Sequence, residues 1–298
     1  MATASPAFAA NPIELTSGFY VNPNSTPAVW ARNNPGDARA ARIQSAIANR
    51  PIGRWFGADA NIGATVASYV GAADSHDKLP VLVAYHLPGR DACGGHSGGG
   101  AGNPAAYRTW ISSLAAGIGG KPAVVVIEPD ALGDFECMSE AAIRERLGML
   151  TYATQQLRQK APNTFAYLDG GNVGWVPAAT MAARLDSAGV RNVRGFAVNV
   201  SNYYPTATSQ NYAGSVVAAL GYPAKFVIDT SRNGNGHNGQ WCNPPGRKLG
   251  VPAQVGGGAE MLLWVKTPGN SDGDCGIGPG IPAGQFSPAL AIRLIDGT

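Results

Sequence analysis

The stretch Ala123–Ile127, AVVVI, followed at once by Glu-Pro-Asp, decides the fold. A short and continuous apolar run of this kind is typical of a parallel strand that is covered on both faces. Runs of the same character recur along the chain, so six strands are predicted in all. The other five are Val81–Tyr85 (VLVAY), Phe165–Leu168, Gly195–Val200, Phe226–Ile228 and Met261–Val265.

Helical patterns separate these strands. The clearest begins at Ser139, a favourable N-cap residue with Glu140 in the first turn, and it keeps apolar residues on one face as far as Leu157. Strand and helix alternate at least six times, which is typical of an α/β barrel or a doubly wound sheet. The other predicted helices cover residues 37–49, 61–70, 104–116, 177–188, 209–220 and 286–295.

Length and charge narrow the class of protein. A chain of 298 residues fits one large domain, and no repeat, charge block or linker divides residues 11–298. The net charge of +3, from 22 basic and 19 acidic residues, is too weak and too mixed to attract nucleic acid or an anionic membrane surface. No apolar run approaches the ~20 residues that span a bilayer. We therefore expect neither nucleic-acid nor membrane partners.

The N-terminus and the cysteines point to an oxidising compartment. Residues 1–10 contain an A-x-A sequence at 7–9, which predicts a signal-peptide remnant or, equally, a disordered leader. The four cysteines form no C-x-x-C and have no histidine at metal-ligand spacing, so two disulfides are favoured over zinc. A secreted, extracellular protein is predicted. Three pairings are possible, and we prefer the two that would each tie adjacent loops together, Cys93 with Cys137 and Cys242 with Cys275.

Carboxylates gather where the predicted strands end. In α/β folds the loops at this edge assemble the active site, and Lys266 would join them there. Any one aspartate alone is as easily a helix cap or a turn former, but five at one edge favour a site. The five are Asp91, Asp130, Asp169, Asp229 and Asp272.

Aromatic residues accompany the carboxylates. Flat aromatic faces, with carboxylates and amides around them, hold a neutral polyhydroxylated ligand without charge. Trp264 lies inside an apolar strand, where a core role is favoured. Trp175 and Trp241 lie in Gly/Asn-rich loops, where a ligand-binding role is favoured. Trp55 is placed at the far end of the same groove, and the long stretch 231–259 is predicted to wall it.

Two segments resemble the signature motifs of glycoside hydrolase family 6, the cellulases of endoglucanase and cellobiohydrolase type. They are VAYHLPGRDAC at Val83–Cys93 and VVVIEPDALG at Val124–Gly133. The resemblance covers the chain from residue 18 to its end. It leads us to expect a distorted single-domain α/β barrel, TIM-like with fewer than eight complete strands, an open cleft at the C-terminal ends of the strands, and a catalytic domain over 11–298. Further matches follow in the family's order at Tyr167–Trp175, Ile228–Gly236 and Trp264–Gly273.

The resemblance also implies roles. Asp130 corresponds to the general acid, Asp91 to a second aspartate that assists it and activates water, and Asp272 to the residue proposed as base. Tyr85 corresponds to a tyrosine that crowds the sugar at the cleavage point. The chain departs from the family's pattern at Ala92, Asn172 and Asn270. The implied substrate-binding residues are Asp169, Trp175, Arg232, Trp241 and Lys266.

These residues predict endo-acting, inverting hydrolysis of β-1,4-glucosidic bonds in cellulose and soluble β-glucans, by a monomer that needs no cofactor and no metal. Inversion needs a protonated acid and a second carboxylate roughly 6.5–9.5 Å away, and crowding of carboxylates keeps one of them protonated. Only Lys266 to Asp272 separate the last strand from the predicted base, which favours an open groove over the long-loop tunnel of a cellobiohydrolase.

The sequence leaves three alternatives. One is a cellobiohydrolase of the same family, and another is a non-catalytic carbohydrate-binding protein, which would have no need of an acid directly after Glu-Pro. The third is an esterase, because Gly95–Gly99 matches the G-x-S-x-G elbow. About ten residues of loop separate Ser97 from the preceding strand, whereas an elbow follows its strand at once, so the esterase is disfavoured.

Overall fold

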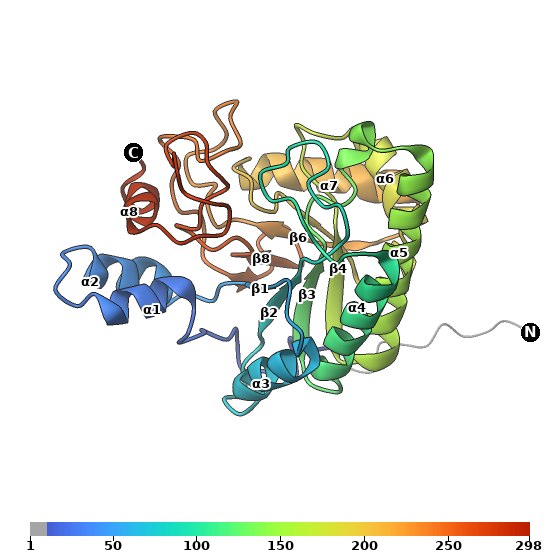
Figure 1. Cartoon of the computed structure of the whole chain (residues 1–298), viewed down its shortest axis with the longest axis horizontal. Coiled ribbons are helices and arrows are strands. Elements are labelled where there is room, and N and C mark those ends of the chain that lie inside the picture. Colours follow the sequence, from blue (N-terminus) through green and yellow to red (C-terminus); the bar gives the residue numbers. More distant parts are fainter. Residues whose placement is uncertain (1–10) are drawn as a thin grey trace, which may run out of the picture.

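The computed structural model describes residues 11–298, and the leader predicted for 1–10 lies outside the described residues. Figure 1 shows a curved sheet with helices packed along its outer side and a smaller helical cluster to one side. The strand order is β1-β2-β3-β4-β5-β6-β8-β7, and only β7 runs antiparallel to its neighbour. The strands are β1 (Arg54–Phe56), β2 (Val81–Ala84), β3 (Ala123–Ile127), β4 (Thr164–Asp169), β5 (Gly195–Val198), β6 (Lys225–Asp229), β7 (Gln254–Val255) and β8 (Met261–Leu263).

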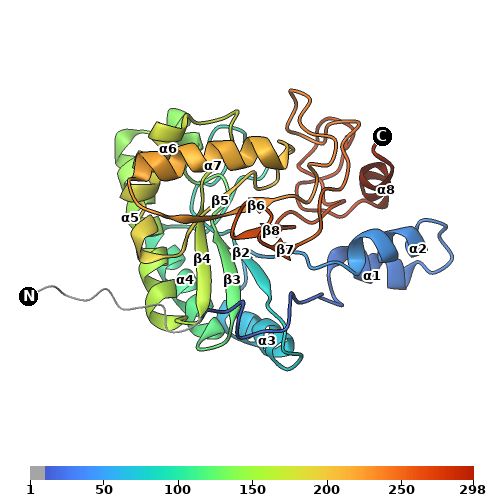
Figure 2. The ribbon, with the colours of Figure 1, turned by 180° about the vertical axis from the view of Figure 1, so that it is seen from behind.

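The sheet curls like a barrel but does not close. Between β1 and β8 one backbone hydrogen bond crosses the gap, from the Gly53 N–H to the Trp264 carbonyl (2.8 Å). The chains approach so closely here that a Cβ on Gly53 would lie 2.8 Å from the Val265 carbonyl oxygen. Figure 2 shows the same sheet from behind. The expected distorted, TIM-like α/β barrel is confirmed, and seven of the eight strands within the described residues are parallel.

All six predicted strands are present, and the sequence misses β1 and β7. The first is three residues long and begins with an arginine, and the second is two exposed residues, so neither carries an apolar run. The helices are α1 (Thr26–Asn33), α2 (Ala40–Ile43), η1 (Gln44–Ala48), α3 (Ile62–Asp74), α4 (Pro104–Ile118), η2 (Asp134–Cys137), α5 (Glu140–Lys160), α6 (Ala178–Ser187), η3 (Val190–Asn192), α7 (Thr206–Leu220) and α8 (Pro288–Asp296).

Helix boundaries follow local capping. The Ser139 hydroxyl accepts a hydrogen bond from the Ala142 N–H (3.2 Å), which starts α5 where the sequence predicts. The segment predicted as one helix over 37–49 is instead the short α2 followed by a π-helical turn, η1. The sequence does not predict α1. Within residues 11–298, no helix has both the length and the apolar character needed to cross a membrane.

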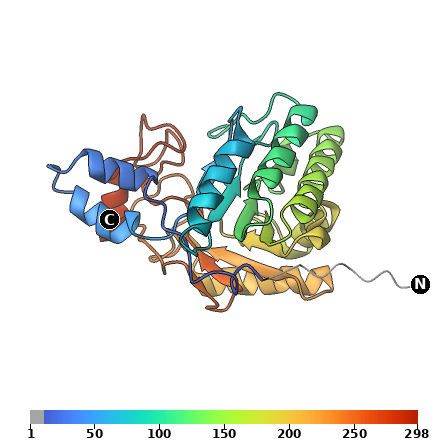
Figure 3. The same cartoon turned by 90° about the horizontal axis from the view of Figure 1, so that it is seen from below.

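Both faces of the sheet are buried, which explains why the strands read as continuous apolar runs. Val83 and Val126 belong to the core inside the curl, whereas Leu82 and Val125 pack outward against the helical layer. A third core joins α1, α2, η1 and α8, and it lies apart from the other helices (Figure 3). Trp264 is 2% exposed and belongs to this third core, so its predicted core role is confirmed.

Candidate active site

A cleft of about 820 Å³ opens at the carboxyl ends of the strands. Its wall includes the predicted catalytic residues Tyr85, Asp130 and Asp272, together with polar groups from loops far apart in the sequence. The parallel arrangement of β2 to β6 and β8 brings these loops to one edge. The cleft is also lined by the predicted binding residues Trp55, Trp241 and Lys266.

Asp130 lies in a strained turn after β3. Its φ is +71° and that of Glu128 is +48°, a left-handed conformation that asparagine and aspartate tolerate better than most residues. Burial raises the pKa of Asp130 well above its ordinary value, and the negative charge of Asp169 raises it further, while Lys266 opposes the shift. The carboxyl group is therefore held protonated into the pH range where an ordinary aspartate is ionised.

Asp169 stands behind the acid rather than in the cleft. It is 3% exposed, and its Oδ2 accepts hydrogen bonds from the backbone N–H groups of Asp130 (3.0 Å) and Gly171 (3.3 Å). Burial also raises the pKa of Asp169. The structure thus gives this predicted substrate-binding residue a contact with the acid's backbone, and its side chain does not line the cleft.

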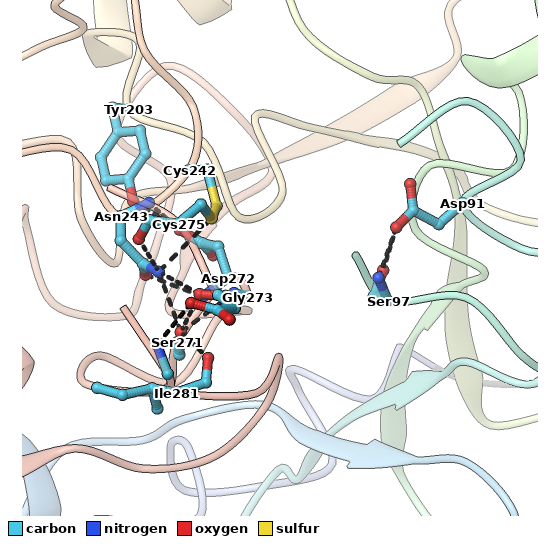
Figure 4. Close-up of a disulfide and its surroundings, with 12 residues drawn as sticks. Asp91, Ser97, Tyr203, Cys242, Asn243, Ser271, Asp272, Gly273, Cys275 and Ile281 are labelled. Carbon is cyan, nitrogen blue, oxygen red and sulfur yellow. Dashed lines mark hydrogen bonds between the residues drawn. A yellow bond between two sulfur atoms is a disulfide. The ribbon is translucent and has the colours of Figure 1, made fainter. Parts of the chain in front are cut away.

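Asp272 is held by two cations. Its Oδ1 lies 3.0 Å from Lys266 Nζ, and its Oδ2 lies 2.9 Å from Arg232 Nη1. The Tyr203 hydroxyl (3.0 Å) and the Asn243 backbone N–H (3.1 Å) donate to the same Oδ2 (Figure 4). Arg232 and Lys266 lower the pKa of Asp272 far below its ordinary value against the opposing effect of burial. This carboxylate therefore stays ionised.

Arg232 contacts Asp272 from the side away from the cleft. It is 2% exposed, and its guanidinium also donates to the Ser201 carbonyl oxygen. Like Asp169, it is a predicted substrate-binding residue that the structure places behind the cleft wall. Lys266, by contrast, lines the cleft and also donates to the Ser271 carbonyl oxygen (3.2 Å).

Asp91 lies in the loop after β2 and faces the loop's own backbone. Its Oδ2 accepts hydrogen bonds from the Ser97 N–H (2.6 Å) and hydroxyl (3.1 Å), on the far side of Figure 4 from Asp272. The Ser97 hydroxyl in turn lies 2.8 Å from the Tyr85 hydroxyl, which reaches the cleft. Asp91 is thus connected to the cleft by two hydroxyl groups.

The aromatic residues divide into three situations. Trp55 donates its indole N–H to the Val265 carbonyl (2.9 Å) and lies edge-on to Tyr85, while Trp241, which also lines the cleft, is 49% exposed. The His96 ring lies 5.2 Å from the Trp241 ring, so the loop after β2 contacts the loop that carries Trp241. Trp175 is 36% exposed, covers Gly133 of the acid's loop and is not part of the cleft wall.

Both predicted disulfides are present. Cys93 is joined to Cys137 (Cα–Cα 5.3 Å) and Cys242 to Cys275 (6.0 Å), and no cysteine of the described residues is free. The first bond links the loop of Asp91 to the loop that follows Asp130. The second links the Trp241 loop to the loop of Asp272. The prediction that each disulfide ties adjacent loops is confirmed.

Several residues that organise the site have no role predicted from the sequence, although Asp229 is among the aspartates expected at the strand ends. Asp229, at the end of β6, accepts backbone N–H groups from Ser231, Ser201, Val265 and Lys266, which holds three loops together. Its position at a strand end was the available signal. No strand-end position marks Tyr203 or Asn243, which hold Asp272 from other loops; for Asn243 the length of its loop, 231–259, was the available signal.

The esterase alternative finds no support in the geometry. Ser97 hydrogen-bonds to Tyr85 and Asp91, and among the described residues no histidine is hydrogen-bonded to its hydroxyl. His237, the candidate base, stacks on Tyr204 with 4.2 Å between ring centroids. Ser97 also lies inside a loop rather than at a strand-to-helix turn.

The sequence of this chain matches a known family and several known proteins. The sequence model described as Glycosyl hydrolases family 6 matches residues 15–298. Endoglucanase 1 of Streptomyces halstedii is 55% identical over 301 residues, which cover 99% of this chain and 94% of the relative. Endoglucanase A of Cellulomonas fimi is 43% identical over 286 residues, which cover 94% of this chain and 61% of the relative.

Solved structures show the same relationship. The endoglucanase Cel6 of Mycobacterium tuberculosis, solved in complex with methyl-cellobiosyl-4-deoxy-4-thio-β-D-cellobioside, superposes with a TM-score of 0.88 at 40% identity. The match covers 97% of this chain and 99% of that one. With a family match that spans the described cleft, its strand-end aspartates and both disulfide-linked loops, this chain belongs to glycosyl hydrolase family 6 and is a glycoside hydrolase.

Proposed function

We propose that the protein hydrolyses internal β-1,4-glucosidic bonds of cellulose and soluble β-glucans with inversion at the anomeric carbon. The observation that carries this proposal is Asp130, a carboxyl group kept protonated at the wall of a cleft that also holds an ionised carboxylate, Asp272. Inverting hydrolysis requires a protonated acid and a carboxylate that activates water. Asp130 fits the first role, and Asp91, connected to the cleft through the hydroxyls of Ser97 and Tyr85, fits the second.

In the proposed reaction the Asp130 proton passes to the glycosidic oxygen as the bond between that oxygen and the anomeric carbon breaks. A water molecule attacks the same carbon from the opposite face and loses a proton. A carboxylate whose pKa is strongly lowered accepts a proton poorly, so we assign to Asp272 the electrostatic stabilisation of the positively charged sugar. We assign the water's proton to Asp91, through the hydroxyls of Ser97 and Tyr85.

Substrate binding is assigned to the aromatic walls. Trp55 and Trp241 present indole rings to the cleft, and Lys266 offers an ammonium group beside them. An aromatic face matches the apolar C–H face of a glucose ring. Trp175 would extend this surface beyond the cleft, next to the loop of the acid.

The test is Asp130→Asn, which keeps the size of the side chain and tolerates the positive φ. We expect turnover of β-glucan to fall by at least ~100-fold, as for loss of a general acid, while affinity for cellotetraose is retained. Undiminished turnover would overturn the assignment of the acid. Retained binding with no turnover by the unaltered protein would instead favour a carbohydrate-binding protein.

The endo mode rests on the relatives named endoglucanases. Viscometry on carboxymethylcellulose tests it, because internal cleavage lowers viscosity before much reducing sugar appears. Release of cellobiose without an early fall in viscosity would favour a cellobiohydrolase. We also propose that the protein is secreted, because the two disulfides fit an oxidising compartment. We propose further that it is a monomer, which analytical sedimentation tests.

A further inference from the structure

Arg146 is a charged side chain buried in the middle of α5. It is 2% exposed and stands among the largest fully buried side chains of the described residues. A guanidinium group stays charged in proteins, and burying it is costly unless hydrogen bonds and opposite charge compensate. The neighbours of Arg146 therefore indicate what this residue is for.

Its guanidinium joins the two loops that carry the proposed acid and its partner aspartate. Nη2 donates to the Gly89 carbonyl oxygen (2.6 Å), two residues before Asp91. Nη1 donates to the Ala131 carbonyl oxygen (3.3 Å), directly after Asp130. Because the guanidinium is planar and rigid, these two contacts fix the distance between the two loops.

Nearby charges compensate for the burial. Burial lowers the pKa of Arg146, and the charges of Asp134 and Glu128 oppose that shift. Glu128 also accepts backbone N–H groups from His86 and Leu87, at 2.9–3.1 Å, so a second buried group links the ends of β2 and β3. Farther out, the disulfide Cys93–Cys137 links the same two loops.

We propose that Arg146 is a positioning residue, which sets the separation of Asp91 and Asp130 by holding the bases of their loops while the disulfide holds the tips. The inference rests on the proposed function, because it concerns the geometry of that reaction. Arg146 does not line the cleft, so it would act through the loops alone. A catalytic group displaced by ~1 Å loses roughly 100-fold in rate.

The test compares Arg146→Met and Arg146→Lys with Arg144→Met, on the same helix. Arg144 is a matched control, since its side chain is 70% exposed and forms a surface ion pair with Glu140 (3.5 Å). For Arg146→Met we expect kcat on β-glucan to fall at least ~10-fold per folded molecule, with KM within about threefold of the original value. Lysine keeps the charge and can donate to the carbonyls, so it should recover part of kcat. Arg144→Met should leave both constants unchanged.

A second experiment tests whether Arg146 and the disulfide Cys93–Cys137 both maintain the separation of the two loops. We expect the loss of kcat in Arg146→Lys to be greater in a Cys93→Ser/Cys137→Ser background than in the unaltered protein, because the tips no longer hold the loops. Equal losses in both backgrounds would contradict a shared function. If Arg146→Met does not fold, Arg146→Lys and its comparison with the double serine variant decide the question.

Two results would overturn the inference alone. One is a lower melting temperature for Arg146→Met with kcat per folded molecule unchanged, which would make the residue purely structural. The other is a rise in KM at constant kcat, which would indicate a binding role. The proposed function fails separately, if Asp130→Asn remains active.

Discussion

Replacing Arg232 by methionine tests how the ionised carboxylate of the cleft is maintained. Arg232 and Asp272 form an ion pair whose side chains are only 3% and 6% exposed, and Lys266, 12% exposed, completes the cluster. Methionine fills a similar volume without the charge. The variant therefore leaves Asp272 buried with one cation in place of two.

The magnitude follows from this burial. Breaking a buried pair by removing one partner typically costs ~3–5 kcal/mol, because the other charge stays buried without compensation. Lys266, Tyr203 and the Asn243 N–H still contact the carboxylate, so we expect the lower end of that range, about 3 kcal/mol. At roughly 2 °C per kcal/mol for a chain of this size, the melting temperature should fall by about 6 °C.

The pH dependence provides a second check. The folded pKa of Asp272 lies below the unfolded value of about 3.9, so its pairing contributes stability that is fully present above that value and is lost as the pH falls through the folded pKa. The difference in stability between the two proteins should thus be constant near neutrality and shrink below about pH 4.

Denaturant unfolding and thermal melts measure these quantities. Arg191→Met is the matched control, because Arg191 pairs with Asp186 at the surface, where the side chains are 56% and 52% exposed. Its loss should cost less than ~1 kcal/mol. A similar small loss in both variants would refute the reasoning, and so would a stability difference that grew at acid pH.

Three further predictions concern other parts of the site. Trp241→Ala should weaken cellotetraose binding by roughly 1–3 kcal/mol with little change in melting temperature, whereas Trp264→Ala should cost ~3–5 kcal/mol of stability; isothermal titration and melts together separate the two. Burial raises the folded pKa of Glu128 to about 7, against about 4.3 unfolded, so stability should fall as the pH rises between these values, and Glu128→Gln should flatten that slope in melts at several pH values; an unchanged slope would contradict the assignment. Removing the disulfide in Cys242→Ser/Cys275→Ser, whose cysteines lie 33 residues apart, should cost up to about 4 kcal/mol in denaturant unfolding.

Strands and their end residues could be predicted because burial on both faces leaves a mark in the sequence. Val81–Ala84 and Ala123–Ile127 are apolar at every position, because alternate side chains of each strand face the inside of the curl and the helices outside it. An aspartate directly after such a run therefore lies at the carboxyl-end edge of the sheet. The strand Arg54–Phe56 leaves no such mark, because two of its three residues are only partly buried.

The contacts within the site could not be predicted in the same way. Spacing along the chain places Asp169 and Arg232 at the correct edge of the sheet, but only the packing of side chains puts them behind Asp130 and Asp272. Tyr203 and Asn243 reach Asp272 from 69 and 29 residues away. Such contacts depend on how loops fold over one another, and no local periodicity encodes that.

The unclosed seam between β1 and β8 has an evolutionary consequence. In a closed barrel, strand number and stagger fix the diameter, so the mouth can widen only if every strand shifts. Here a single backbone hydrogen bond, from Gly53 to Trp264, spans the gap. Substitutions along this edge can therefore alter the width of the groove while every hydrogen-bonded ladder stays intact, and one scaffold can adapt to glucan chains that lie differently in the groove.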